Sequence, residues 1–146
     1  MALFPTTVVL ATDGSKHAGA AAAVAVETCR ATASALQVVH VAPVGWSPFT
    51  VNPAEFSAVE AQFHQVLEEA NAHIEQLGGT VDQAHLRTGH AAEEIVALCR
   101  EVEAGLLVIG TRGQGRVQQA VLGSVSAAVV REAPCPVLVA RADAAP

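Results

Sequence analysis

Residues 7–15 read TVVLATDGS, a short apolar run that is rich in β-branched side chains and ends in Asp-Gly-Ser. Such a run followed at once by turn residues predicts a buried strand, a tight turn and the start of a helix. Ser15 suits the N-cap of that helix, and small residues then recur at helical spacing from Ala18 to Ala33. Because alanine side chains let a helix approach a sheet closely, the stretch predicts a strand with a helix packed against it.

The same alternation of strand and helix continues along the chain. Further strands are expected at 36–41, 80–88, 106–109 and 136–140, and further helices at 53–77, after Gly89, and at 124–132. Asn52 and Pro53 suit the cap and first position of the long helix. Polar residues indicate that 80–88 is an edge strand, and the continuous apolar run 106–109 predicts a central one. The pattern predicts one α/β domain over residues 1–146, a doubly wound, Rossmann-like parallel sheet of five strands with helices on both faces.

Composition narrows the functions that this domain can have. The 146 residues carry eight Lys plus Arg against fourteen Asp plus Glu, a net charge of -6, and aromatic residues make up 3%. Binding nucleic acid needs a basic face and rings for stacking, so that class is disfavoured. No apolar run approaches the roughly 20 residues of a membrane span, and the N-terminus does not resemble a signal peptide. We therefore expect a cytoplasmic protein without a membrane or nucleic-acid partner.

The segment after the 106–109 strand carries the pattern that points to a ligand. It reads GTRGQGRVQQAVLGSVS over residues 110–126. Glycines before a helix start let backbone N–H groups approach phosphate oxygens. A P-loop is excluded because Lys16 is the only lysine, and Gly-x-Gly-x-x-Gly fails at Gln118. What remains is Gly-x2-Gly-x9-Gly-Ser from Gly110 onward, which we expect to meet the ends of the strands at 7–12 and 36–41 where the strand order reverses.

The chain resembles the universal stress protein family in this spacing, in residues 8–15, in the His40-Val41 strand end, in GHAAEEI at 89–95 and in APCPVLV at 133–139. In that family the glycine spacing marks the ATP-binding branch, so the resemblance implies ATP with Mg²⁺. By position, the Val41 backbone would meet the adenine edge, and Asp13 would lie near the ribose and phosphates. The implied nucleotide-binding residues are Thr12, Asp13, Val41, Gly110, Arg112, Gly113, Gly123, Ser124, Val125 and Ser126.

The resemblance also implies a homodimer that acts in stress response or signalling through nucleotide-dependent binding. Its contact would be the strand Pro136 to Arg141, because an apolar strand at a sheet edge must be covered or paired. One departure is visible, since the chain has Ala104-Gly105-Leu106 where the family usually has Ala-Asp-Leu. We expect this change to alter the helix-to-strand turn and to leave the ligand contacts in place.

Other interpretations of the same residues stay open. The glycines can form a loop without a ligand, Asp13 can cap the first helix, and Arg112 and Arg116 can be solvated charges. A carboxylate near a polyphosphate would act through Mg²⁺ or water. The six histidines and three cysteines show no metal-ligand spacing, and no residue can be assigned as catalytic. The rival functions are a slow ATPase or phosphoryl-transfer enzyme and an interaction dimer that binds no nucleotide.

Overall fold

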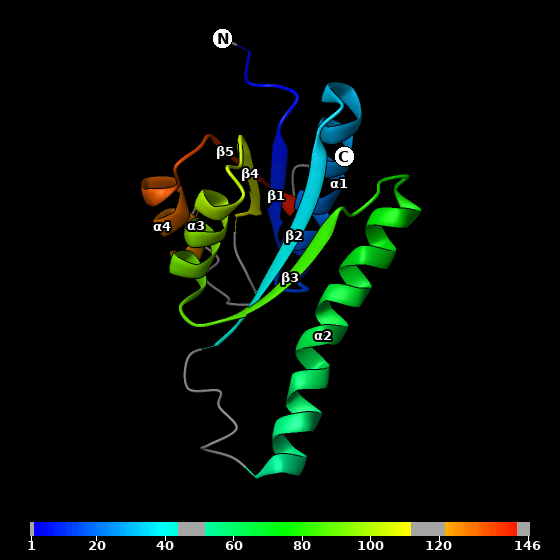
Figure 1. Cartoon of the computed structure of the whole chain (residues 1–146), viewed down its shortest axis with the longest axis vertical. Helices are drawn as coiled ribbons and strands as arrows, with labels where there is room; N and C mark the ends of the chain where they lie inside the picture. Colours follow the sequence, from blue (N-terminus) through cyan, green and yellow to red (C-terminus); the bar gives the residue numbers. More distant parts are fainter. Residues whose placement is uncertain (1, 44–51, 112–121, 143–146) are drawn as a thin grey trace.

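The computed structural model describes residues 2–43, 52–111 and 122–142, which form a sheet between two layers of helices (Figure 1). The strands are β1 (Thr7–Ala11), β2 (Ala35–Ala42), β3 (Gln83–Thr88), β4 (Leu106–Gly110) and β5 (Val137–Ala140). The helices are α1 (Lys16–Thr32), α2 (Pro53–Gln76), α3 (Ala91–Glu101) and α4 (Ser124–Glu132). All strand pairs are parallel, in the order β3-β2-β1-β4-β5. The doubly wound fold expected from the sequence is confirmed.

Each face of the sheet is covered by two helices, α1 and α2 on one side and α3 and α4 on the other (Figure 1). Side chains of β1 alternate between the two cores, because Val8 and Leu10 pack with α1 and α2 while Val9 and Ala11 pack with α3 and α4. β4 lies inside the sheet, as its apolar sequence predicts, and all its residues are buried. The middle position belongs to β1, with β4 next to it.

Helix α1 lies close to the sheet through its small side chains. Its buried residues are Ala18, Ala21, Ala22, Ala25 and Val26. Ser15 is the N-cap, as predicted, and its hydroxyl accepts a hydrogen bond from the Ala18 N–H at 3.2 Å. The start of α1 is therefore held immediately after the end of β1.

Helix α2 is longer than the strands that it covers. Asn52 caps it as predicted, since its side chain accepts from the Glu55 N–H at 2.8 Å. Its buried residues are Leu67 and Ile74, both in the second half. The first half extends beyond the carboxyl edge of the sheet (Figure 1). Helix α2 thus covers the sheet only in part and also flanks the region beyond the strand ends.

Strand β3 occupies one edge of the sheet, as predicted, but begins at Gln83, later than the expected Thr80. The Gly79 N–H donates to the Ile74 carbonyl at 2.9 Å and closes the turn that ends α2, before the expected strand. Pairing with β2 begins only at Gln83, opposite Gln37. The Arg87 guanidinium pairs through two nitrogens with the Glu101 carboxylate of α3. This hydrogen bond raises the pKa of Arg87 and lowers that of Glu101. The ion pair ties the β3 edge to α3.

The turn from α3 into β4 explains the glycine at position 105. The Gly105 N–H donates to the Thr7 carbonyl at 3.0 Å, which draws the backbone of Gly105 against the neighbouring chain. A Cβ at Gly105 would lie 2.2 Å from Thr6 Oγ1 and 2.7 Å from Thr6 Cβ. Any side chain here, including the aspartate usual in the resembling family, therefore overlaps with Thr6.

Substitutions at Gly105 and Thr6, made singly and together, test this explanation. We expect Gly105→Ala to lower the free energy of unfolding by about 1–3 kcal/mol, because the added methyl group overlaps with Thr6. In the double variant Thr6→Gly/Gly105→Ala the overlap is removed, so the loss should be smaller than the sum of the single losses. Urea unfolding of the four proteins measures both quantities. Strictly additive losses would contradict the steric explanation.

Candidate functional site

The carboxyl ends of β1, β2 and β4 meet where the strand order reverses. From β1 the chain passes outward to β2 and β3, and then returns to place β4 on the other side of β1. The last pair between β1 and β2 joins Ala11 to Val39. Since backbone groups of alternate residues point to the same side of a strand, those of Val41 point into the space beyond the end of β1. The three segments expected to converge therefore do so.

Hydrogen bonds within the turn from β1 to α1 fix its shape. The Thr12 N–H donates to the Val39 carbonyl at 2.9 Å, and Thr12 Oγ1 accepts from the Gly14 N–H at 3.3 Å. Asp13 Oδ1 accepts from the Ser15 N–H at 2.9 Å. The N-cap is Ser15, so the interpretation of Asp13 as the cap of this helix is wrong. Asp13 is half-buried at the carboxyl edge of the sheet.

His40 of β2 holds the end of β1. Its side chain is 8% exposed, and Nδ1 lies 2.9 Å from the Thr12 carbonyl oxygen. A carbonyl only accepts hydrogen bonds, so Nδ1 carries the proton. The ring lies against Phe63 of α2, with 6.0 Å between ring centroids. His40 thus sets the position of the Thr12 carbonyl, directly before Asp13.

The end of β4 is fixed from three directions. The Thr111 N–H donates to the Ala140 carbonyl of β5 at 3.1 Å, and the Thr111 carbonyl accepts from the Gly123 N–H at 2.7 Å. The Thr111 hydroxyl lies 3.3 Å from Nδ1 of His17 in α1. Gly110 packs so closely on α1 that a Cβ there would lie 2.7 Å from the His17 carbonyl oxygen. Close packing of backbone against backbone therefore explains the glycine at 110.

The first turn of α4 faces this junction. Gly123 is the N-cap, without a side-chain capping bond, so Ser124 is not the cap. The first hydrogen bond of the helix runs from the Ala127 N–H to the Gly123 carbonyl at 2.9 Å. The N–H groups of Ser124, Val125 and Ser126 accordingly have no acceptor within the helix, as at any helix N-terminus.

The serine side chains of this turn differ in their environment. Ser124 is exposed, whereas Ser126 is 3% exposed and its hydroxyl donates to the Gly110 carbonyl at 2.6 Å. A phosphate oxygen needs a donor, so of these two hydroxyls the one of Ser124 is the candidate, because Ser126 donates its proton to Gly110. Arg112 and Gly113 of the expected site, and the neighbouring Arg116, lie outside the described residues.

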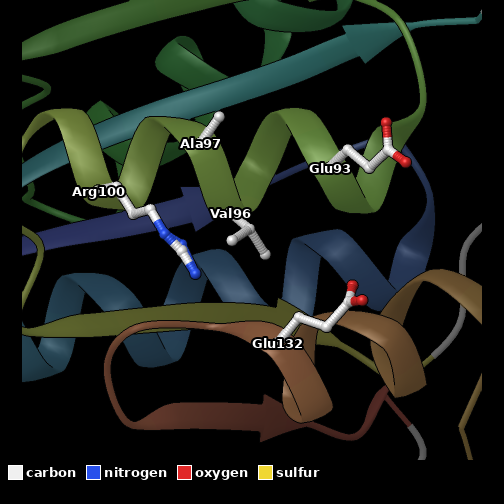
Figure 2. A pocket seen from close by; sticks show the side chains of 5 residues that line it. All are labelled: Glu93, Val96, Ala97, Arg100 and Glu132. Carbon is white, nitrogen blue, oxygen red and sulfur yellow. The ribbon is translucent and has the colours of Figure 1, made fainter.

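A separate groove lies between α3 and α4, with a volume of about 550 Å³. Figure 2 shows its lining, which consists of Glu93, Val96, Ala97, Arg100 and Glu132. Two carboxylates against one guanidinium disfavour a polyanionic ligand there. The groove is therefore a poor candidate for the phosphate site that the glycine spacing predicts.

Neither a metal centre nor a reactive thiol stands out in the described part of the chain. Among residues 2–43, 52–111 and 122–142, no three His, Cys, Asp or Glu side chains are grouped to hold a metal ion. Burial raises the pKa of the Cys29 thiol to about 11 and that of Cys99 to about 12. Burial also raises the pKa of Cys135. These thiols are protonated near neutral pH and are weak nucleophiles.

Comparison with known proteins agrees with this arrangement. The model of the universal stress protein family matches residues 5–141. This chain belongs to the universal stress protein family. A family member from Thermus aquaticus is 40% identical over 137 residues, which cover 92% of this chain and 98% of that protein. The family expected from the sequence motifs is confirmed.

Two solved structures of family members contain nucleotides. One universal stress protein in complex with cAMP has a TM-score of 0.73 and 28% identity, covering 91% of this chain and 94% of that one. Another, from Archaeoglobus fulgidus in complex with dAMP, has a TM-score of 0.68 and 25% identity, covering 95% of this chain and 99% of that one.

In the described part of the present chain, no helix is long and apolar enough to cross a membrane.

Sequence reasoning missed three residues of this edge. His17, His40 and Thr111 all make contacts here, yet histidines without metal-ligand spacing carry no signal for a site, and a histidine on a strand such as His40 indicates only a core or edge position. Their place in the chain is the signal that could find them. Thr111 directly follows a strand, and His17 lies in the first turn of a helix whose N-terminus faces the same edge. Polar residues at such places in a doubly wound sheet lie near its ligand crevice.

The packing of Gly110 on α1 generates a prediction with an internal control. Gly110→Ala should lower the free energy of unfolding by about 1–3 kcal/mol without any ligand, because its methyl group would meet the His17 backbone. Gly19→Ala is the matched control, since a Cβ at Gly19 has nothing within 4 Å and alanine favours the helix by about 1 kcal/mol. Urea unfolding should show a lower free energy of unfolding for Gly110→Ala and a higher one for Gly19→Ala. An undiminished stability of Gly110→Ala would refute the packing argument.

Proposed function

We propose that this universal stress protein binds ATP, with Mg²⁺, at the carboxyl ends of β1, β2 and β4. The observation that carries the proposal is the convergence of the β1–α1 turn, the Val41 backbone and the N-terminus of α4 where the strand order reverses. This is the place where doubly wound sheets bind nucleotides. In cytoplasmic stress response or signalling, such a protein works by changing its contacts when nucleotide binds.

The backbone of Val41 suits the base of the nucleotide. Its N–H and C=O point past the end of β1, beyond the Ala11–Val39 pair, and offer a donor and an acceptor for an adenine edge. The Val41 side chain packs with the α3–α4 core, so the position of its backbone is rigid. The complexes of family members with cAMP and dAMP, which both carry adenine, support an adenine nucleotide.

Two helix N-termini suit the phosphates. α1 begins at Lys16 and α4 begins at Ser124, and both helices follow the carboxyl ends of strands. Their N–H groups and dipoles favour anions at this edge. Arg112, Gly113 and Gly123 belong to the same proposed phosphate region by the glycine spacing. Asp13 is the carboxylate of the β1–α1 turn, and one carboxylate with phosphate oxygens is a common Mg²⁺ ligand set; when bound, the ion would neutralise phosphate charge.

Binding rather than turnover is the proposed activity. Phosphoryl transfer needs a group that orients the nucleophile, and we assign no side chain of the described residues to that role. Incubation with ATP and Mg²⁺ should release phosphate far more slowly than the roughly 1–10³ per second of ordinary enzymes. A rate within that range would revive the enzymatic alternative.

Ser124 and Ser126 form a matched pair for testing the site. Ser124→Ala should weaken ATP binding by roughly 1.5–3 kcal/mol, because it removes a donor to a charged oxygen, and leave the melting temperature of the free protein unchanged. Ser126→Ala should instead destabilise the free protein by about 1–3 kcal/mol, since the buried Gly110 carbonyl loses its donor. Calorimetric titration with ATP and melting curves separate the two effects. Absence of ATP binding by the wild type, or equal affinity of Ser124→Ala, would overturn the proposed site.

We further propose that two copies of the chain associate through β5. This strand lies at the edge of the described sheet, and its residues Val137, Leu138 and Val139 are half-buried. Thr111 donates to Ala140, and Leu107 to Pro136, so the backbone groups of Val137 and Val139 point away from β4. Pairing of this edge about a two-fold axis would satisfy those groups and cover the apolar side chains.

Substitution at Val139 tests this edge. Val139→Pro removes an outward N–H without removing a bond to β4, and we expect it to shift the protein from dimer to monomer. Val139→Ala loses the same apolar side chain but keeps the N–H, and should dimerise more tightly than the proline variant. Sedimentation velocity over a concentration series measures the association constants. A monomeric wild type, or identical dimerisation of both variants, would contradict pairing through β5.

A further inference from the structure

We propose that His17 is a positioning residue of the nucleotide site. It acts through Thr111 to hold Thr111 and Gly123, the two residues that flank the glycine segment, defined here as residues 112–122. The inference rests on the proposed function and adds a residue that the glycine spacing does not contain. It starts from one buried polar side chain, because Thr111 is 4% exposed. A buried hydroxyl needs a hydrogen-bond partner, and its partner here is His17.

The first step concerns how Thr111 is held. Its N–H is bonded to Ala140 and its carbonyl to Gly123, so both backbone groups are engaged by elements C-terminal to the glycine segment. The hydroxyl bonds to an element from the opposite end of the chain, since His17 is 94 residues away. Thr111 therefore joins α1, β5 and the start of α4 at a single residue.

The second step concerns how His17 is held. It lies in the first turn of α1, which is capped by Ser15. Its backbone packs against Gly110, where even a methyl group would come within 2.7 Å of the His17 carbonyl oxygen. Because backbone packing fixes the Cα and Cβ atoms of His17, few rotamers are open to its imidazole, and the one adopted reaches Thr111. The contact is thus part of a rigid junction.

The third step connects this junction to the ligand. Thr111 and Gly123 flank the glycine segment, and the 2.7 Å bond from the Gly123 N–H to the Thr111 carbonyl joins them. Gly123 is also the N-cap of α4, so a displacement of Thr111 would displace the N–H groups of the first turn of α4. Donors that face a phosphate lose affinity when they shift by a fraction of an ångström. His17 therefore contributes to nucleotide binding through Thr111.

A double-mutant cycle tests the proposal. The variants are His17→Ala, Thr111→Val and their combination, with Thr111→Ser to restore the hydroxyl and the exposed His64→Ala of α2 as the histidine control. Calorimetric titration with Mg²⁺ and ATP should show about tenfold weaker binding for each single variant. The combined variant should be no weaker than either single one, because both remove the same contact. Thr111→Ser and His64→Ala should bind within about twofold of the wild type.

Amide hydrogen exchange of Gly123 in the ligand-free protein gives a second readout. We expect exchange at Gly123 to be several-fold faster in His17→Ala and Thr111→Val, because its acceptor is less well held, and to be restored in Thr111→Ser. Unchanged exchange at Gly123 in both variants would overturn the proposal, as would additive losses of ATP affinity. If the wild type binds no ATP, the proposed function fails, and exchange at Gly123 alone decides whether His17 positions the junction.

Discussion

The backbone of Gly110 packs directly on the first turn of α1, and this contact allows no side chain between them. Most of the carboxyl edge of the sheet depends on it. The Gly110 carbonyl accepts the hydroxyl of Ser126, which holds the start of α4, and the next residue bonds to β5 and to Gly123. Two helix N-termini and two strand ends therefore meet at one place because a glycine lets backbone approach backbone.

Most of the fold could be predicted because its determinants are local. The apolar run after Thr7 and the turn residues Asp13-Gly14-Ser15 specify a strand, a turn and a capped helix within nine residues, and the structure has all three. Asn52 likewise caps α2 as its sequence context indicates. The start of β3 could not be predicted locally, because it is set by pairing with β2, which begins at Gln83 opposite Gln37. The apolar run of β4 predicts correctly that it lies inside the sheet, whereas its place beside β1 follows only from packing.

The candidate site was predictable only where a motif marks it. The glycine spacing predicts a site at the carboxyl edge of the sheet, but the contacts that shape this edge join residues far apart in sequence. His40 reaches Thr12 across 28 residues and His17 reaches Thr111 across 94. Pattern reasoning assigns such histidines to the core or to no role, since nothing in their neighbourhood distinguishes them. Ser126 shows the opposite limitation, because a motif position expected to face the ligand donates its proton to the backbone instead.

The alanines of α1 have a further consequence for this edge. Burying an alanine costs almost no side-chain conformational entropy, whereas a leucine or methionine must give up its rotamers. Four of the five buried residues of α1 are alanine, so this helix docks without freezing flexible side chains. Its distance from the sheet is set by contact between its methyl groups and strand side chains such as Val8, Leu10 and Val108. The small side chains of α1 therefore keep the distance between the helix and the sheet constant. The distance between α1 and the sheet is accordingly insensitive to rotamer changes within α1, but a single larger residue on its buried face would increase that distance.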